Sequence, residues 1–280
     1  MKLLRYGATG QEKPGLLDSD GHIRDLSGVI PDLGPAQISP EGLETLAAVD
    51  PRDLPTVEGA PRLGPPLAGI GQIHAIGLNY RNHAREAGMA IPDEPILFTK
   101  ATSCLSGPDD DIVIPRGAQT VDWEVELGVV IGTAAYQVEE AQALEHVAGY
   151  LTANDVSERD HQIRRGGQWV KGKSAPGFGP LGPWLVTKDE VPDPQNLTVK
   201  LTVNGEIRQD GHTSDMIFPV ARIVAHVSAF LRLMPGDVIL TGTPAGVGMG
   251  MKPPVYLQPG DQVTVEVEGL GVQRQQVRNQ

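Results

Sequence analysis

The sequence predicts a mainly β protein with a few covering helices, built as a mixed β roll or barrel. Many short segments rich in Val, Ile, Leu and Thr are bounded by Gly, Asp or Pro, a pattern typical of strands joined by turns. These segments do not alternate regularly with helical patterns, which disfavours a doubly wound fold or a TIM barrel. The 34 glycines and 24 prolines are spread along the chain rather than repeated, which indicates many turns rather than low complexity.

Residues 1–65 predict a small β-rich N-terminal domain followed by a linker. Residues 1–30 alternate short apolar runs with turn signals such as GATG and DSDG, as expected for a β meander. A helix is expected over residues 39–49, with Ser39 as its N-cap and Pro40 at its first position. The proline-rich stretch that follows reads as extended chain, so we place a domain boundary there.

Residues 66–280 are expected to form a second, larger domain in which strands predominate. The expected strands are IHAIGLNY (73–80), PILFTK (95–100), DIVIP (111–115), VDWEVELGVVIG (121–132), GYLTAND (149–155), LTVKLTVNGEI (197–207), GDVILTG (236–242) and DQVTVEVEGLG (261–271). Helical periodicity is expected over 81–89, 138–146 and 218–233. The polar, glycine-rich segment 155–183 is long for a connection inside a compact domain, and such segments are more often functional than idle.

Composition restricts the partners of this protein. A formal net charge of -12 argues against nucleic acid or an anionic membrane surface as the main partner. It leaves anionic small molecules open, because a bound metal ion can invert the local field. Cys104 is the only cysteine, so neither a disulfide framework nor a thiolate metal cluster is possible within the chain. The N-terminus lacks the apolar core of a signal peptide and no stretch approaches 18 apolar residues, so we expect a soluble cytoplasmic protein.

Three acids recur at every second position of the segment 121–132. In a strand, Asp122, Glu124 and Glu126 would share one face, where like charges repel. A hard cation such as Mg²⁺ binds carboxylate oxygens, and Asp155, at the end of the expected strand 149–155, is the best candidate for a third ligand beside Glu124 and Glu126. The alternative is a solvent-facing strand whose charges deter aggregation.

Two further patterns suggest catalytic side chains. His83 and Glu86 are three residues apart and would share one helical face, where the carboxylate could orient the imidazole as a general base for water. The alternative is an ordinary surface His–Glu pair. Lys171 and Lys173 lie in a basic loop beside the predicted acids, where a lysine could stabilise a developing negative charge, although a merely solvated loop is equally compatible with the composition.

The glycine-rich stretch 241–250 follows an expected strand but is not followed by a helix start. A dinucleotide-binding turn requires that strand–turn–helix context, so we reject such a site. The glycines more plausibly let the backbone approach a ligand, to which Thr243 would offer a hydroxyl.

Taken together, IGLNYRNHAREAG, PILFTKATSCLSGP, DWEVELGVVIG, ANDVSERDHQ, WVKGKS and PGDVILTGTPAGVG resemble the fumarylacetoacetate hydrolase family, over residues 70–275 and in the family's order. The resemblance implies a mixed β-sandwich roll, a homodimer or dimer of dimers, and Mg²⁺ or Mn²⁺. The residues that it assigns to the site are Glu124, Glu126 and Asp155 as metal ligands, His83 and Glu86 as a water-activating dyad in a lid segment, Lys173 as an electrophilic lysine, and Arg159, Gln162 and Thr243 as substrate contacts. Asp122 matches no ligand position, so we expect it to lie behind the ligands or to face solvent.

The opening MKLLRYG and the stretch RGGQWVKGKSAPGFGPLGPWLVT are similar to a subgroup that acts on sugar-derived acids. This implies an enzyme that hydrolyses a C–C bond of a 2-oxo acid substrate such as 2,4-diketo-3-deoxy-L-rhamnonate or -fuconate, giving pyruvate and a hydroxy acid such as lactate. Ureidoglycolate lyase, acylpyruvate hydrolase and oxaloacetate decarboxylase remain alternatives. A catalytically dead metal-binding dimer would be marked by loss of His83, Glu86 or Lys173, and all three are present.

Overall fold

The computed structural model describes all 280 residues and consists mainly of strands, as the sequence predicts. The larger of its two main sheets has nine strands in the order β3-β2-β1-β13-β10-β9-β16-β4-β5. In that order they are β3 (Ile23–Asp25), β2 (Lys13–Leu17), β1 (Lys2–Tyr6), β13 (Leu185–Thr187), β10 (Val147–Asn154), β9 (Val125–Ile131), β16 (Val238–Leu240), β4 (Ile73–Gly77) and β5 (Ile96–Lys100).

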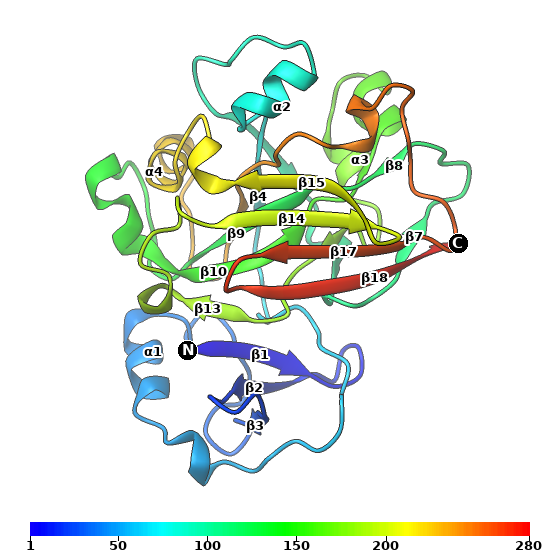
Figure 1. Cartoon of the computed structure of the whole chain (residues 1–280). Helices are drawn as coiled ribbons and strands as arrows, with labels where there is room; N and C mark the ends of the chain where they lie inside the picture. The colour runs from blue at the N-terminus through cyan, green and yellow to red at the C-terminus, as the bar shows by residue number, and fades with distance from the viewer.

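The second sheet has five strands and packs against the centre of the first, as in a β-sandwich (Figure 1). Its strands in order are β15 (Glu206–His212), β14 (Thr198–Val203), β17 (Gln262–Val267), β18 (Gly271–Asn279) and β7 (Ile112–Ile114). Along β14 and β17 every second residue is buried, so the valine- and leucine-rich face points inward. β9 and β10 are buried at every position, which places them in the middle of the core.

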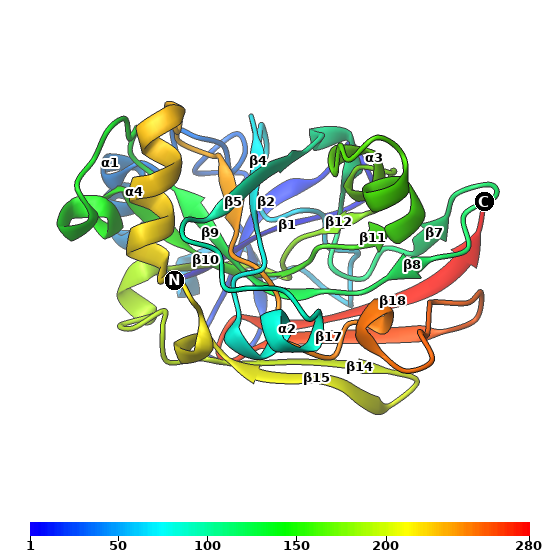
Figure 2. The same cartoon turned by 90° about the horizontal axis from the view of Figure 1, so that it is seen from above.

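Short elements complete the fold around this sandwich. Two small sheets pair β8 (Val121–Asp122) with β11 (Ser157–Glu158) and β6 (Leu105–Ser106) with β12 (Gly179–Pro180). The α-helices are α1 (Pro40–Ala47), α2 (Arg81–Glu86), α3 (Val170–Lys173) and α4 (Val220–Phe230). None of them is long and apolar enough to cross a lipid bilayer. Seen from above, α3 lies beside β11, and β11 lies beside β8 (Figure 2).

The N-terminal strands form the predicted meander, but they also extend the large sheet. β1 pairs antiparallel with β13 through Leu3 and Leu185, and Leu3 belongs to the same hydrophobic cluster as residues near the C-terminus, such as Val277. β1 to β3 and α1 lie on the side of the molecule opposite α2 (Figure 1). A division of the chain at residue 65 therefore stays a prediction, since the sheet runs across it.

Several element predictions were wrong in extent. The segment 121–132 forms two strands, β8 and β9, because the residues between them, Trp123 and Glu124, belong to neither strand. The segment 197–207 is the first part of a hairpin, whose turn at Asn204 has a φ of 54°. The helix expected over 138–146 is a 3₁₀ turn, and the helix expected over 218–233 is the shorter α4, which follows Pro219.

Strand β18 was not predicted at all, because its buried face carries polar side chains. Gln273 and Gln275 are fully buried in a segment that reads as polar. Their side-chain amides donate hydrogen bonds to backbone carbonyl groups instead of to water. Gln273 Nε2 donates to Thr152 O at 2.8 Å and Gln275 Nε2 donates to Pro108 O at 2.7 Å. These hydrogen bonds to distant segments allow the polar segment to form an inner strand of the sheet, and a search for alternating hydrophobic residues cannot detect them.

Candidate active site

The three acids predicted as metal ligands meet at the end of the β9–β10 pair. Glu126 lies in β9 opposite Ala153 of β10, and the chain then leads directly to Asp155. Asp155 N donates to Glu124 O at 2.9 Å, which holds the two acids together where the ladder ends. Carboxylate oxygens of Glu124, Glu126 and Asp155 all lie within 4.8 Å of one another, and all three residues are buried.

Two buried lysines contact this cluster. Lys173 Nζ donates to Glu124 Oε2 at 2.6 Å and to Asp155 Oδ2 at 2.7 Å, while Lys100 Nζ donates to Asp155 Oδ1 at 2.5 Å. Burial opposes ionisation of Lys173, but Asp155 and Glu124 together raise its pKa, so its ammonium group stays protonated. The neighbouring Lys171 is exposed and donates instead to Arg165 O.

The position of Lys173 depends on the glycine in WVKGKS. Gly172 lies so close to β11 that a β-carbon there would stand 2.4 Å from Glu158 O. Because glycine has no side chain, α3 can rest directly on β11, and this brings the last residue of the helix into the acid cluster. The motif thus separates one buried lysine from one exposed lysine.

Glu126 is the only one of the three acids without a lysine or arginine partner. Its carboxylate accepts one backbone hydrogen bond, from Gly242 N at 2.7 Å. Burial and the nearby charges of Asp155 and Glu124 raise the pKa of Glu126 well above its ordinary value. By contrast, although burial opposes it, Lys173 and Arg159 lower the pKa of Glu124 to about 2. The cluster therefore lacks one positive charge next to Glu126, and a divalent cation with oxygen ligands would fit there.

Asp122 is buried and belongs to the site, so the expectation that it could face solvent was wrong. Its carboxylate accepts hydrogen bonds from Arg159 Nε at 2.8 Å, from Gly248 N at 2.7 Å and from Met249 N at 3.0 Å. Arg159 Nη1 in turn lies 2.7 Å from Glu124 Oε1. Asp122 thus lies behind the acids, where it fixes both Arg159 and the glycine-rich loop.

Gln162 and Thr243 also border the acid cluster. Gln162 Oε1 accepts from Arg159 Nη1 at 3.0 Å. Thr243 Oγ1 donates to Val125 O at 2.8 Å and accepts from Gln209 Nε2 at 2.7 Å, so its proton is already committed to the backbone. Both side chains line the cavity, and their contact with substrate stays a prediction.

His83 and Glu86 share one face of α2, as their spacing predicts. His83 Nδ1 lies 3.1 Å from Glu86 Oε2, and Glu86 Oε1 accepts from Gly246 N at 2.9 Å. With the Nδ1 proton directed to the carboxylate, Nε2 of His83 is free to accept a proton. The pair is therefore oriented by a loop that is distant in sequence.

These side chains surround one cavity of about 250 Å³. The predicted residues that line it are His83, Glu124, Glu126, Asp155, Arg159, Gln162, Lys173 and Thr243. Glu86 does not line the cavity but contacts His83. Sequence reasoning missed Lys100, which shares a face of β5 with the cavity-lining Phe98. The sequence offered no signal for it, since only the structure shows that Phe98 lines the cavity.

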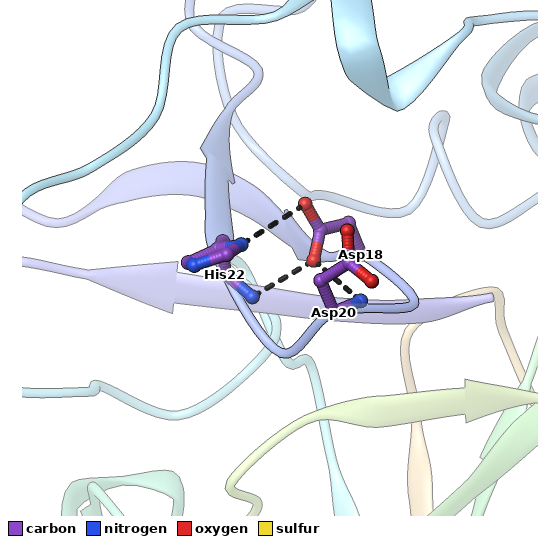
Figure 3. Close-up of side chains that lie close together, drawn as sticks. All are labelled: Asp18, Asp20 and His22. Atoms are coloured by element: carbon purple, nitrogen blue, oxygen red, sulfur yellow. Dashed lines mark hydrogen bonds and ion pairs between the residues drawn. The ribbon is translucent and has the colours of Figure 1, made fainter.

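Another group of possible metal ligands lies far from this cavity, in the turn between β2 and β3 (Figure 3). There the Asp18 carboxylate accepts from the backbone N–H of Asp20 at 3.0 Å and of His22 at 2.8 Å, and from Arg24 Nε at 2.7 Å. Asp20 and His22 are exposed. These bonds explain the cluster as a closed turn.

Known proteins resemble the chain over its whole length. The family model described as fumarylacetoacetate (FAA) hydrolase C-terminal matches residues 72–278. A Burkholderia ambifaria protein, provisionally named a hydrolase, is 57% identical over 280 residues, which span 100% of this chain and 99% of that protein.

Two solved structures show the same fold. The fumarylacetoacetate hydrolase of the psychrophile Exiguobacterium antarcticum superposes with a TM-score of 0.90 at 39% identity and covers 100% of both chains. The maleylpyruvate hydrolase of Sphingobium sp. SYK-6, solved with manganese(II) and pyruvate, superposes with a TM-score of 0.82 at 28% identity and covers 100% of this chain and 99% of that one. The chain belongs to the fumarylacetoacetate hydrolase family of enzymes.

Proposed function

We propose that this protein hydrolyses the C3–C4 bond of a 2,4-diketo acid and releases pyruvate and a second carboxylic acid. The observation that carries the proposal is that one cavity is lined at once by the three acids, by His83 and by Lys173. Such a set can bind a 2-oxo acid head, activate water and stabilise an enolate. The relative whose structure holds manganese(II) and pyruvate supports both the metal and the product.

Glu124, Glu126 and Asp155 would hold Mg²⁺ or Mn²⁺, which when bound acts as a Lewis acid toward the carboxylate and 2-oxo oxygens of the substrate. The missing positive charge beside Glu126 is the structural reason to expect the ion there. Because these acids are buried, their interaction with the cation is screened little by water.

His83 starts the reaction in this proposal. Its Nε2 takes a proton from a water molecule, whose oxygen attacks C4 of the substrate, while Glu86 holds Nδ1 and stabilises the imidazolium that forms. The C3–C4 bond then breaks and its electron pair passes to C3 and the 2-oxo group, giving the enolate of pyruvate. Lys173 stabilises the enolate oxygen. The proton that His83 took from water passes to C3, which completes pyruvate, and C4, now bearing the water oxygen, leaves as the second carboxylic acid.

The tail beyond C4 differs among substrates of this class. The resemblance of the sequence to the sugar-acid subgroup implies a 5-hydroxyl group, as in 2,4-diketo-3-deoxy-L-rhamnonate, and cleavage would then give pyruvate and lactate. The homodimer and the cytoplasmic location implied by the sequence also stay predictions, for which light scattering and fractionation are the direct tests.

The test is an assay of pyruvate release with Mg²⁺ or Mn²⁺ across a panel of 2,4-diketo acids, ureidoglycolate and oxaloacetate. We expect Glu126→Gln to lose metal binding by calorimetry and activity together. His83→Ala should keep metal binding but lose about 10²- to 10⁴-fold in kcat, as for loss of a general base. His22→Ala, in an exposed histidine of the N-terminal turn, is the matched control.

Three results would contradict the proposal. Full turnover in a chelator would exclude the metal role, and normal hydrolysis by His83→Ala would exclude the dyad. Release of urea from ureidoglycolate, or decarboxylation of oxaloacetate without cleavage of any diketo acid, would show that the site runs a different reaction.

A further inference from the structure

We infer that the outer part of the cavity binds an uncharged hydrocarbon tail, so that the preferred substrates are 2,4-diketo acids with an alkyl group on C4. This inference rests on the proposed cleavage of a 2,4-diketo acid and departs from the hydroxylated tail that the sequence resemblance implies. It concerns the apolar rim, which we define as Leu78, Met89, Phe98, Ile163, Trp169 and Met249.

The cavity is polar at its buried end and apolar at its open end. Every charged or amide residue that lines the buried end is at most 5% exposed: Glu124, Glu126, Asp155, Arg159, Gln162 and Lys173. At the rim, Met89 is 53% and Ile163 is 50% exposed. A substrate whose acid head reaches the buried end must therefore direct its tail along the apolar rim.

The rim has almost nothing with which to bind a polar tail. Among the lining residues that are not buried, only the imidazole of His83, the proposed base, and the indole N–H of Trp169 offer a strong hydrogen bond, and the other side chains are apolar. The cavity's cations are used at the buried end, where Arg159 contacts Asp122 and Glu124, and Lys173 contacts Glu124 and Asp155. A tail with several hydroxyl groups or a second carboxylate would lose water without gaining partners.

The rim is also held in place before any tail arrives. The Phe98 and Trp169 rings meet edge to face, with centroids 5.1 Å apart and an interplanar angle of 64°. Trp169 lies against Gly77, where a β-carbon would stand 2.5 Å from its Cζ3 atom. On its inner side, Phe98 faces Lys173, whose Nζ lies 5.2 Å from the ring centroid. The apolar wall thus begins next to the proposed catalytic lysine, where C4 and its substituent would lie.

The experiment is a measurement of kcat/KM for pyruvate release from 2,4-dioxopentanoate, -hexanoate, -heptanoate and -octanoate, whose tails grow from methyl to butyl. We expect a rise of about fourfold per methylene, the fold-change that corresponds to burying one methylene group, and so about 60-fold across the series. We also expect 5-hydroxy-2,4-dioxohexanoate and 2,4-dioxoheptanedioate to be poorer substrates than the alkyl acids of equal chain length.

Substitutions in the rim should flatten this dependence on length. Trp169→Ala and Ile163→Ala should each reduce the gain from methyl to butyl to below about tenfold, because fewer methylene groups are then shielded from water. Ile163 is exposed, so its replacement does not threaten the fold. Ile207→Ala is the matched control, since Ile207 is 53% exposed on β15 and lies outside the cavity; it should leave the length dependence unchanged.

A flat series, a preference for the 5-hydroxyl or the second carboxylate, or an undiminished length dependence in both rim variants would overturn the inference alone. In each of those cases pyruvate is still released and the proposed function stands. If no member of the panel releases pyruvate, the proposed function fails and the inference fails with it.

Discussion

Asp122 shows how one buried carboxylate can organise a cavity that it does not itself line. It is fully buried and bonds to Arg159 and to two backbone N–H groups of the glycine-rich loop. Each of these donors is in turn fixed in position by its hydrogen bond to the carboxylate. Asp122 therefore connects Arg159, which contacts Glu124, to the glycine-rich loop, which contacts Glu86.

We predict that Asp122→Asn lowers the free energy of unfolding by about 3 kcal/mol, because it leaves the buried guanidinium of Arg159 short of one charge partner. The asparagine amide would also point hydrogen atoms at backbone N–H groups that need an acceptor. Urea unfolding followed by circular dichroism measures this change. Asp20→Asn, in an exposed acid of the β2–β3 turn, is the control; an equal loss in both variants would contradict the role given to Asp122.

Glu126 makes the stability of the metal-free protein depend on pH. Its pKa is raised in the folded state above the ordinary 4.5, so the folded protein binds a proton more tightly than the unfolded chain does. The stabilisation is complete below the ordinary pKa and is lost as pH rises through the raised one. The melting temperature in a chelator should therefore fall as pH rises above about 4.5, and Mg²⁺ should weaken that fall, since the cation stabilises the ionised carboxylate.

Differential scanning fluorimetry across this pH range, with chelator and with Mg²⁺, checks the prediction. Glu126→Gln should remove most of the pH dependence, because glutamine cannot ionise. Glu266→Gln, in an exposed position of β17, should retain it. An unchanged slope in Glu126→Gln would assign the effect to other groups.

At the scale of elements, α2 is a helix that cannot be stable by itself. It has six residues, and its N-cap residue Tyr80 makes no side-chain capping bond. Contacts with distant segments hold it: Arg81 Nη1 donates to Met216 O at 2.8 Å, Asn82 Oδ1 accepts from Ala245 N at 3.2 Å, and Glu86 binds Gly246 N. The position of the His83 imidazole is thus set by the glycine-rich loop.

We predict that Asn82→Ala loosens α2 by about 1 kcal/mol, the cost of one lost hydrogen bond. Amide hydrogen exchange in α2 and at residues 245–246 should become about fivefold faster, with no change in β9 or β10, because opening is local. Arg85→Ala, at an exposed position of the same helix, should leave exchange unchanged. Faster exchange throughout the molecule would show instead that α2 unfolds only with the core.

At the scale of the whole molecule, the N-terminal region is joined to the body by a sheet, by apolar contacts and by ion pairs. β1 pairs with β13, and Leu3 is fully buried in the common core. Across the interface, Arg62 Nη2 lies 2.6 Å from Asp110 Oδ2, while its Nη1 lies 2.9 Å from Glu12 Oε1 within the N-terminal region. A continuous core favours cooperative unfolding of both regions.

We therefore predict one calorimetric transition for the whole chain. Leu3→Ala should cost about 2–5 kcal/mol, as for other buried leucines, and should lower the temperature of that single transition. Leu144→Ala, in a half-exposed leucine of the 140–146 turn, is the control and should have little effect. Two separate transitions, with only one sensitive to Leu3, would show that residues 1–65 fold as an independent domain.

The sequence by itself determined features that depend on local pattern and side-chain chemistry. The β-rich class, the N-terminal meander and the approximate limits of α1 follow from alternation, turn residues and capping. The predicted grouping of Glu124, Glu126 and Asp155 was confirmed as a spatial cluster, because strand spacing and a short connection already restrict where those side chains can lie.

Only the tertiary structure decided features that arise where distant segments meet. The break after Asp122, the burial of Gln273 in β18, the contact of Lys100 with Asp155 and the position of α2 all depend on partners far away in the chain. The polarity of the cavity belongs to the same group, because Phe98 and Trp169 are 71 residues apart in sequence and meet only in the fold. Local sequence pattern predicts which face of an element is buried in the core. Hydrogen bonding and packing between distant segments determine which residues contact that face.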